Sequence, residues 1–318
     1  MIEHVLVPLD GSSLAECVLP HVVAVTRACG SRVTLLQVLE RPSTAGPVRF
    51  VDPLRWYMSE AEARAYLDGW TNRLQEAGLR VHSVLLEGQA AERIIEFARD
   101  EGAGLIILSS HGRSGLSGWN VSSIVQKIIL RAYIPAMLVR AYRPAPAELT
   151  SLRYRRLLLP LDGSRRAECA LPLATHLARF HRAELLLAHV VSRPPMLCRL
   201  TVTQEDIELA DRIAERNRME ALRYLEQLRP QQDVDVRIRL LVGDHVAAIL
   251  HDLVEEESVD LVVLSAHGYS GGTRWPYGSM AVNFIGYGTT PLLIVQDLSP
   301  DEVERTKAEM LARERKGH

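Results

Sequence analysis

Residues 5–20 read VLVPLDGSSLAECVLP, and residues 157–172 read LLLPLDGSRRAECALP, so that eleven of sixteen aligned positions are identical. A second pair of matching segments follows at residues 105–112 (LIILSSHG) and 261–268 (LVVLSAHG). The copies are 152 residues apart at the first pair (157 minus 5) and 156 apart at the second (261 minus 105). A unit of about 140 residues is much longer than a solenoid repeat, so each copy is predicted to be a whole domain.

The repeat determines the expected domain boundaries. The first domain is expected over residues 1–142 and the second over residues 153–298. The linker between them, residues 143–152, carries two prolines and no apolar periodicity, which is typical of a connecting segment. Residues 299–318 start with Ser-Pro-Asp-Glu and are then highly charged, so a charged C-terminal helix or tail is predicted.

Apolar runs alternate with helical periodicity in each copy. Residues 5–9 form a continuous apolar run, as expected for a strand that is buried on both faces. A helix is expected over residues 13–29, a long loop over 41–58 and a helix over 59–77. The alternation predicts an α/β fold with two tandem flavodoxin-like or Rossmann-like domains, each a five-stranded, mainly parallel sheet with helices on both faces. Ligands of such sheets bind beyond the carboxyl ends of the strands, where strand order reverses.

The composition excludes several classes of protein. The 318 residues include 37 Lys and Arg against 39 Asp and Glu, which gives no electrostatic reason to expect binding to nucleic acid or to a membrane surface. No apolar run approaches the ~18 residues of a membrane span, and the N-terminus lacks the pattern of a secretory signal. The four cysteines have no metal or CxxC spacing, so we expect reduced thiols, no metal site and a cytoplasmic location.

One candidate site follows the first strand of each copy, where Asp10-Gly11-Ser12 matches Asp162-Gly163-Ser164. A carboxylate at the carboxyl end of a strand can accept hydrogen bonds from a ligand amine or hydroxyl. Alternatively, the Asp or Ser caps the next helix. The recurrence of the triplet favours a binding role, although common ancestry would also preserve it.

A second candidate follows the fourth strand. In the second copy, Gly268 is followed by nine residues and then by Gly278-Ser279 at the start of a helix. Gly268 would let the backbone approach an anion, and the N–H groups and hydroxyl at 278–279 would form a phosphate site. The alternative is a glycine-rich connection that binds nothing. The sequence has no P-loop, no dinucleotide-binding fingerprint and no nucleophile elbow.

These segments together resemble the universal stress protein family, over nearly the whole chain taken as two tandem copies. The resemblance rests on the Pro-Leu-Asp-Gly-Ser start, the Ser-His-Gly after the fourth strand and the Gly-Ser at the last helix. It implies that ATP phosphates are held by a G-x-x-G-(nine residues)-G-[S/T] pattern and that adenine lies against the Asp and the end of the second strand. It therefore implies an adenine-nucleotide-binding sensor or regulator of the stress response, with ATP (or AMP or ADP) as ligand and Mg²⁺ held through the phosphates.

The resemblance assigns roles to residues of both copies. In the second, Asp162 and Val190 would contact the adenosine part, and Gly268, Gly278 and Ser279 the phosphates. The set expected in the second domain is Pro160, Asp162, Val190, Leu264, Ser265, His267, Gly268, Gly278 and Ser279. The set in the first domain is Pro8, Asp10, Val38, Leu108, Ser109, Gly112, Ser122 and Ser123.

The two sets depart from the family pattern to different degrees. Ser265 stands at the first Gly of the pattern, where a left-handed backbone would be strained. The first copy departs there too, at Ser109, and again at Ser122-Ser123 in place of Gly-Ser. ATP is therefore expected mainly in the second domain.

The resemblance also implies that the fifth strands, near residues 137–140 and 293–296, pair to form an intramolecular pseudo-dimer, with further homodimerisation left open. Two other functions remain open. The serines at 109, 122 and 265 favour a nucleotide-free interaction scaffold of the same fold. A hydrolase would use His267 with Asp162. No general base is evidently arranged, so no catalytic residue is assigned and a dedicated enzyme is not predicted, although weak ATP hydrolysis stays open.

Overall fold

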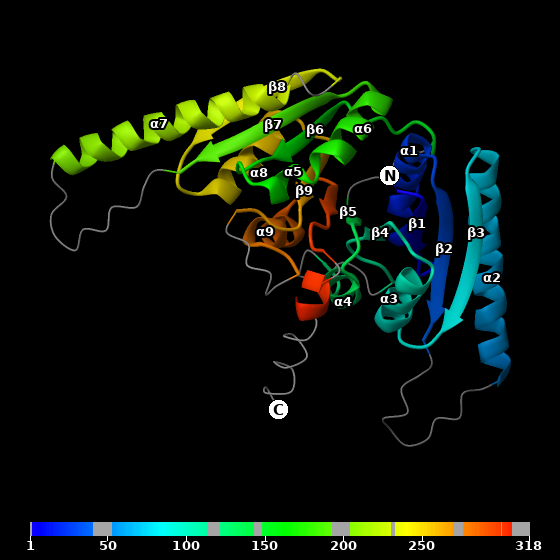
Figure 1. Cartoon of the computed structure of the whole chain (residues 1–318). Helices are drawn as coiled ribbons and strands as arrows, with labels where there is room; N and C mark the ends of the chain where they lie inside the picture. The colour runs from blue at the N-terminus through cyan, green and yellow to red at the C-terminus, as the bar shows by residue number, and fades with distance from the viewer. Residues whose placement is uncertain are drawn as a thin grey trace, which may run out of the picture. The chain divides into compact units, whose positions relative to one another are not determined.

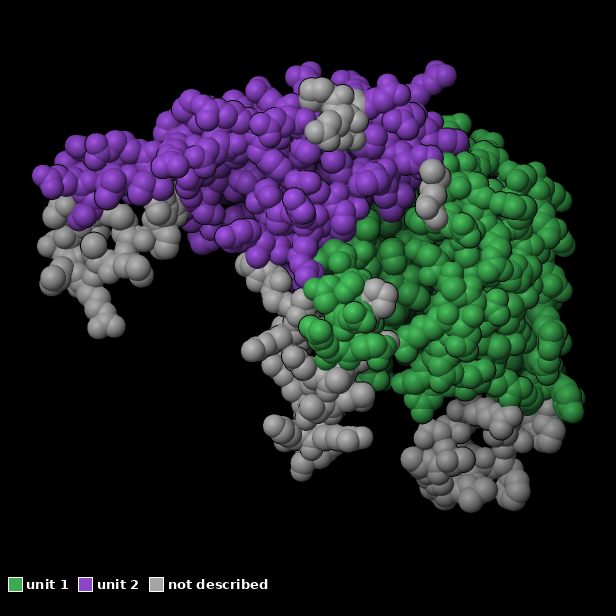
Figure 2. Space-filling view, viewed as in Figure 1, with its two compact units in different colours: residues 1–153, 273–276, 285–318 green, residues 154–272, 277–284 purple. Residues whose placement is uncertain are grey.

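The computed structural model describes residues 2–40, 53–113, 121–142, 148–192, 204–229, 233–269, 276–299 and 301–306 (Figure 1). The chain divides into two compact units (Figure 2). Unit 1 comprises residues 1–153, 273–276 and 285–318, and unit 2 comprises residues 154–272 and 277–284. Part of the expected linker (143–147) and most of the C-terminal segment (307–318) lie outside the described residues.

Unit 1 contains a sheet with the strand order β3-β2-β1-β4-β5-β10. Strands β1 to β5 run parallel, and β10 runs antiparallel to β5. Strand order reverses between the neighbours β1 and β4, which creates a switch point at their carboxyl ends. The strand bounds are β1 His4–Pro8, β2 Arg32–Leu39, β3 Arg80–Glu87, β4 Leu105–Ser109, β5 Ala136–Val139 and β10 Leu292–Val295.

The core of unit 1 explains its apolar runs. Val5, Leu6 and Val7 on β1 are completely buried, as are the three residues 105–107 on β4. Burial on both faces removes the usual alternation of polar and apolar residues, so these strands appear in the sequence as continuous apolar runs.

Two hydrogen bonds link neighbouring helices of unit 1. Arg27 donates a hydrogen bond from Nη2 to the Ala77 carbonyl (2.6 Å), which joins the end of α1 to the end of α2. Arg99 donates to the Arg131 carbonyl, which joins α3 to α4. The helix bounds are η1 (a 3₁₀ helix) Ala15–Val18, α1 Leu19–Cys29, α2 Pro53–Glu76, α3 Ala90–Asp100 and α4 Ser123–Ala132.

Helix α2 begins earlier than predicted. The sequence favoured a loop over residues 41–58, but the helix starts at Pro53, so this prediction is wrong for residues 53–58. Proline interrupts a helix only in its interior, because its fixed φ and missing N–H are compatible with the first turn. Residues 41–52 of the expected loop lie outside the described part of the chain.

Unit 2 repeats the arrangement with the strand order β9-β6-β7-β8, all parallel. The predicted fold class, α/β with a mainly parallel sheet and helices on both faces, is confirmed. The bounds are β6 Arg156–Pro160, α5 Arg165–Glu168, α6 Leu171–His181, β7 Glu184–Val191, α7 Gln204–Leu228, β8 Val236–Val242, α8 Val246–Glu256, β9 Leu261–Ser265 and α9 Ser279–Tyr287.

Strand β10 comes from the second sequence copy but belongs to unit 1. It pairs with β5 through Leu292 with Leu138, Leu293 with Met137 and Ile294 with Ala136. The fifth strands of the two repeats are therefore hydrogen-bonded neighbours within this unit. Directly after β5, the fully buried Arg140 donates from Nη1 to the Ile285 carbonyl (3.1 Å).

Ser299 and Glu302 form a capping box before the helical residues 301–306. The backbone N–H of Ser299 donates to Glu302 Oε2 (2.9 Å), and the Glu302 N–H donates to Ser299 Oγ (3.4 Å). None of the helices in the described ranges combines the length and the apolar character needed to span a bilayer.

Candidate functional site

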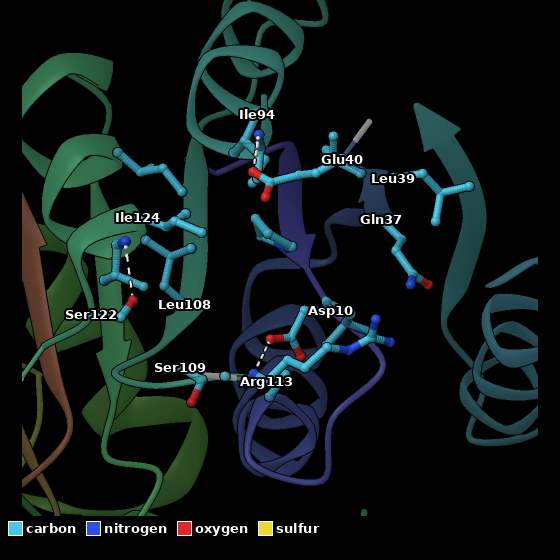
Figure 3. Close-up of a pocket in the computed structure, with 18 of the residues that line it drawn as sticks. Asp10, Gln37, Leu39, Glu40, Ile94, Leu108, Ser109, Arg113, Ser122 and Ile124 are labelled. Atoms are coloured by element: carbon cyan, nitrogen blue, oxygen red, sulfur yellow. Dashed lines mark hydrogen bonds between the residues drawn. The ribbon is translucent and has the colours of Figure 1, made fainter. Parts of the chain in front are cut away.

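A cleft of about 930 Å³ opens in unit 1 at the carboxyl ends of β1, β2 and β4 (Figure 3). Residues from α2, α3 and α4 complete its walls. The cleft therefore lies at the switch point between β1 and β4, where the topology favours ligand binding. It brings together seven of the eight residues expected in the first domain, namely Pro8, Asp10, Val38, Leu108, Ser109, Gly112 and Ser122. Ser123, the eighth, is exposed and does not line it.

Asp10 joins the two motif loops of the first copy. Its Oδ1 accepts hydrogen bonds from the Ser12 N–H (3.0 Å) and the Ser12 hydroxyl (2.6 Å). Its Oδ2 accepts from the N–H of Arg113, which follows β4 (Figure 3). Ser12 Oγ also accepts from the Ala15 N–H (3.2 Å) at the first residue of η1. The serine thus bonds to the start of the next helix, while the aspartate connects loops 103 residues apart.

The second copy has the same bonds. Asp162 Oδ1 accepts from the Ser164 N–H (3.0 Å) and hydroxyl (2.6 Å), and Oδ2 accepts from the Tyr269 N–H (2.6 Å). Ser164 caps α5 through the Ala167 N–H (3.1 Å). The recurrence shows that Asp-Gly-Ser and the distant His-Gly form one structural unit in each copy.

The glycine of that unit has a steric role. A Cβ on Gly112 would overlap with Asp10 Oδ2, and a Cβ on Gly268 would overlap with Asp162 Oδ2. Neither glycine has a positive φ. The anionic group that lies against each glycine is thus the protein's own carboxylate. This carboxylate by itself requires a residue without a side chain, whether or not a ligand binds.

The backbone at Ser265 is not left-handed, so the strain considered for a serine at this position does not arise. Among the described residues other than glycine, only Tyr133, Arg182 and Ser258 have positive φ, so neither Ser109 nor Ser265 is left-handed. The hydroxyls at these two positions bond within the loop. Ser109 Oγ contacts the carbonyls of Leu14 (2.9 Å) and His111 (2.7 Å), and Ser265 Oγ accepts from the His267 N–H (3.3 Å).

Helices α4 and α9 begin in matching ways. Ser122 caps α4 because its Oγ accepts from the Val125 N–H (3.4 Å), and its own N–H donates to the Ser110 carbonyl (2.8 Å). Gly278 donates to the Ala266 carbonyl (2.7 Å) in the same way. The N–H groups of Ser122 and Gly278 are therefore used inside the protein, as is the N–H of Val125 in the first turn of α4.

Sequence reasoning missed several polar side chains that line the cleft, among them Gln37, Glu40, Arg55 and Arg113. Arg113 and Arg55 bring positive charge, and Glu40 accepts from the Ala90 N–H (3.0 Å) at the start of α3 (Figure 3). Gln37, near the end of β2, is only 4% exposed. A polar residue within the apolar run of β2 was the signal that could have identified Gln37.

The two histidines of the loops are buried. His111 lines the cleft, and its Nδ1 lies 3.1 Å from Ser110 Oγ. His267 is 3% exposed. In the hydrolase alternative, Asp162 would act with His267, but both its carboxylate oxygens already accept backbone or hydroxyl hydrogens from Ser164 and Tyr269. Within the described ranges, no group of three or more His, Cys, Asp or Glu side chains is placed to hold a metal ion.

Position 37 differs between the copies. Pro8 pairs with Leu36 and Pro160 pairs with Ala188, so the next residues, Gln37 and His189, are equivalent. Burial lowers the pKa of His189, while a hydrogen bond with the Leu161 backbone and the charge of Asp162 act in the opposite direction. The two sites therefore share their aspartate and glycine but differ in this side chain.

Comparison with known proteins gives consistent matches. The sequence model of the universal stress protein family matches residues 1–140 and 153–296. A universal stress protein of Methanocaldococcus jannaschii is 27% identical over 156 residues, covering 44% of this chain and 96% of that protein. One from Thermus aquaticus is 30% identical over 142 residues, covering 44% of this chain and 100% of that protein. Each of these relatives corresponds in length to one copy of the repeat.

Solved structures match the chain over nearly its whole length. A universal stress protein from Archaeoglobus fulgidus superposes with a TM-score of 0.66 at 17% identity, covering 93% of this chain and 98% of that one. A functionally unknown protein from Pseudomonas aeruginosa gives a TM-score of 0.68 at 16% identity, covering 98% of both chains. At these identities the likeness shows the fold.

Proposed function

Because this chain belongs to the universal stress protein family, we propose that it binds an adenine nucleotide, with ATP as the first candidate, and acts as a cytosolic regulator in a stress response. The observation that carries this proposal is the cleft of about 930 Å³ at the β1–β4 switch point. That volume lies within the range of about 300–1,000 Å³ that is usual for small-molecule sites.

The chemistry of the cleft fits a nucleotide. Val38, Ile94 and Leu108 provide apolar surface for a flat base. Arg55 and Arg113 supply positive charge, and a guanidinium can bind phosphate oxygens in a bidentate manner. The start of α4 adds the positive end of a helix dipole. Apolar and cationic surfaces in one cleft match a ligand that has a base at one end and phosphates at the other.

We propose a second site in the second copy. This site contains the same contact between an aspartate and a glycine loop, here Asp162 and Gly268, and Gly278 precedes α9. The connecting segment 270–275 lies outside the described residues. Mg²⁺ would enter either site only with the phosphates of the nucleotide.

We further propose that the two copies act as an intramolecular pseudo-dimer. The antiparallel pairing of β5 with β10 supports this, because it joins the fifth strands of the two repeats. Fusion in one chain raises the effective concentration of the partners and removes the entropy cost of bringing two chains together.

The nucleotide-free scaffold is the second candidate. It is favoured by Ser122, whose N–H and hydroxyl are both used inside unit 1. Calorimetric titration of ATP with Mg²⁺ into the purified chain decides between the two. The matched variants Ser122→Trp and Gly278→Trp obstruct equivalent positions, and Glu220→Trp on the exposed face of α7 is the control.

The expected stoichiometry is about two, falling to about one in each of the two site variants and unchanged in the control. If the stoichiometry is about one and only one of the two site variants abolishes binding, ATP binds in the copy that carries that substitution. Absence of heat, together with no nucleotide extracted from the protein as isolated, would overturn the proposal and favour the scaffold.

A further inference from the structure

Gln37 lines the first cleft, and its side-chain amide is not fully hydrogen-bonded. It lies on β2 and is only 4% exposed, yet its Oε1 has no hydrogen-bond partner among the residues that the structure describes. Figure 3 shows its amide extending toward the side of the cleft that holds Asp10 and Arg113. A buried oxygen without a hydrogen-bond partner destabilises the fold, so this carboxamide calls for a partner.

A ligand can supply that partner. A carboxamide offers an acceptor oxygen beside a donor NH₂, and rotation about its last bond exchanges their places. Adenine presents the complementary pair, a 6-amino donor beside a ring-nitrogen acceptor. The side chain of Gln37 lines the same cleft as the apolar residues Val38 and Leu39. It can therefore bond the edge of a base whose faces lie against apolar groups.

The second copy differs at this position. The equivalent residue is His189, whose Nδ1 is also buried without a partner among the described residues. A neutral imidazole carries its donor and its acceptor on opposite sides of the ring and cannot offer the adjacent pair of a carboxamide. The two copies therefore carry different hydrogen-bonding groups at equivalent positions of β2 and β7.

We propose that Gln37 determines base specificity in the first cleft by hydrogen bonding to the 6-amino edge of adenine. This inference rests on the proposed function, since it needs a nucleotide in that cleft. Gln37 would then select between purines that differ at position 6.

The test measures two ligands against two proteins. ATP and purine riboside 5′-triphosphate, which lacks the 6-amino group, are titrated into the full chain carrying Gly278→Trp, so that the first cleft is measured alone. The same titrations use this chain with Gln37→Leu added. Melting temperatures check that each variant is folded. If Gln37→Leu does not fold, Gln37→His replaces it, because the second copy already has His at that position.

We expect the Gly278→Trp chain to prefer ATP by about tenfold, and Gln37→Leu to reduce this preference to near unity while it weakens ATP binding by a similar factor. An ATP preference that Gln37→Leu leaves unchanged would overturn the role of Gln37 and leave the proposed function intact. Failure of the Gly278→Trp chain to bind either ligand, when the parent chain also binds none, would instead overturn the proposed function and this inference with it.

Discussion

The carboxylate of Asp10 occupies the space that a side chain on Gly112 would need, and its Oδ2 accepts the N–H of the next residue, Arg113. The pair Asp162 and Gly268 repeats this relationship in the second copy. One contact thus joins the ends of β1 and β4 and shapes the floor of the cleft.

This relationship predicts that Gly112→Ala is destabilising. The added Cβ must displace a carboxylate that Ser12 also holds, so we expect a loss of about 1–3 kcal/mol in the free energy of unfolding. Urea unfolding of the wild-type and variant chains measures it. Gly278→Ala is the control, because its Cβ would lie 3.4 Å from the Ala266 carbonyl, an ordinary contact.

Adding Asp10→Ala to Gly112→Ala tests the cause of that loss. The double variant removes the overlapping carboxylate, so its destabilisation should be smaller than the sum of the two single changes. Strictly additive losses would show that the overlap with Asp10 is not the reason.

The helix starts at Ser122 and Gly278 give a second prediction. Ser122→Ala removes the cap from the Val125 N–H and should cost about 0.5–1 kcal/mol. Gly278→Ser should instead raise the melting temperature slightly, because Gly278 has no positive φ and a serine can cap α9 as Ser122 caps α4. A lower melting temperature for Gly278→Ser would contradict this equivalence.

A third prediction concerns Glu257 in unit 2, whose side chain is 12% exposed. Its carboxylate contacts Arg156 (3.6 Å) on β6, and Arg239 (3.0 Å) and Arg237 on β8. Glu257→Gln removes the negative charge that faces three arginines, so we expect the free energy of unfolding to fall by about 1–3 kcal/mol. The loss should be smaller than for a fully buried ion pair because the arginines are partly exposed.

Thermal unfolding in low and high salt measures the effect of Glu257→Gln. The matched control is Glu220→Gln, which breaks an exposed pair with Arg216 (3.0 Å) on α7 and should change stability by less than about 0.5 kcal/mol. Equal effects of the two substitutions would contradict the importance of burial at Glu257.

The fourth prediction is a pH dependence that comes from His21 on α1. Burial lowers its pKa to about 4 from the usual 6.5. The unfolded chain therefore binds a proton at His21 below about pH 6.5, while the folded chain does so only near pH 4. The contribution of His21 to the free energy of unfolding is therefore fully present above pH 6.5. It is lost as the pH falls toward 4, and the total loss is about 3 kcal/mol.

His21→Leu tests this sign, because the second copy has Leu173 at the matching position. The variant should lose less stability than the parent chain between pH 6.5 and pH 4 and show no added pH dependence above 7. Parallel stability curves for the two chains across that range would contradict the assignment to His21.

The sequence predicted the fold because its signals are local. The continuous apolar runs at residues 5–7 and 105–107 arise from strands buried on both faces. The buried residues of α3, Ala91, Ile94, Ile95 and Ala98, lie at the helical spacing i, i+3, i+4 and i+7, which is visible in the sequence. The start of α2 was wrong, because Pro53 was read as a loop residue although a first helical turn accepts it.

The sequence by itself determined the two copies, the alternation of strands and helices, and most of the residues at the candidate site, because periodicity and repeated motifs depend on neighbouring residues. Only the tertiary structure decided that Asp10 meets the loop of Gly112, that the hydroxyl of Ser109 is used within its loop, and that Gln37 is buried beside the cleft. These features join segments as far as 103 residues apart. Burial and hydrogen bonding at that separation follow from packing, which no local pattern encodes.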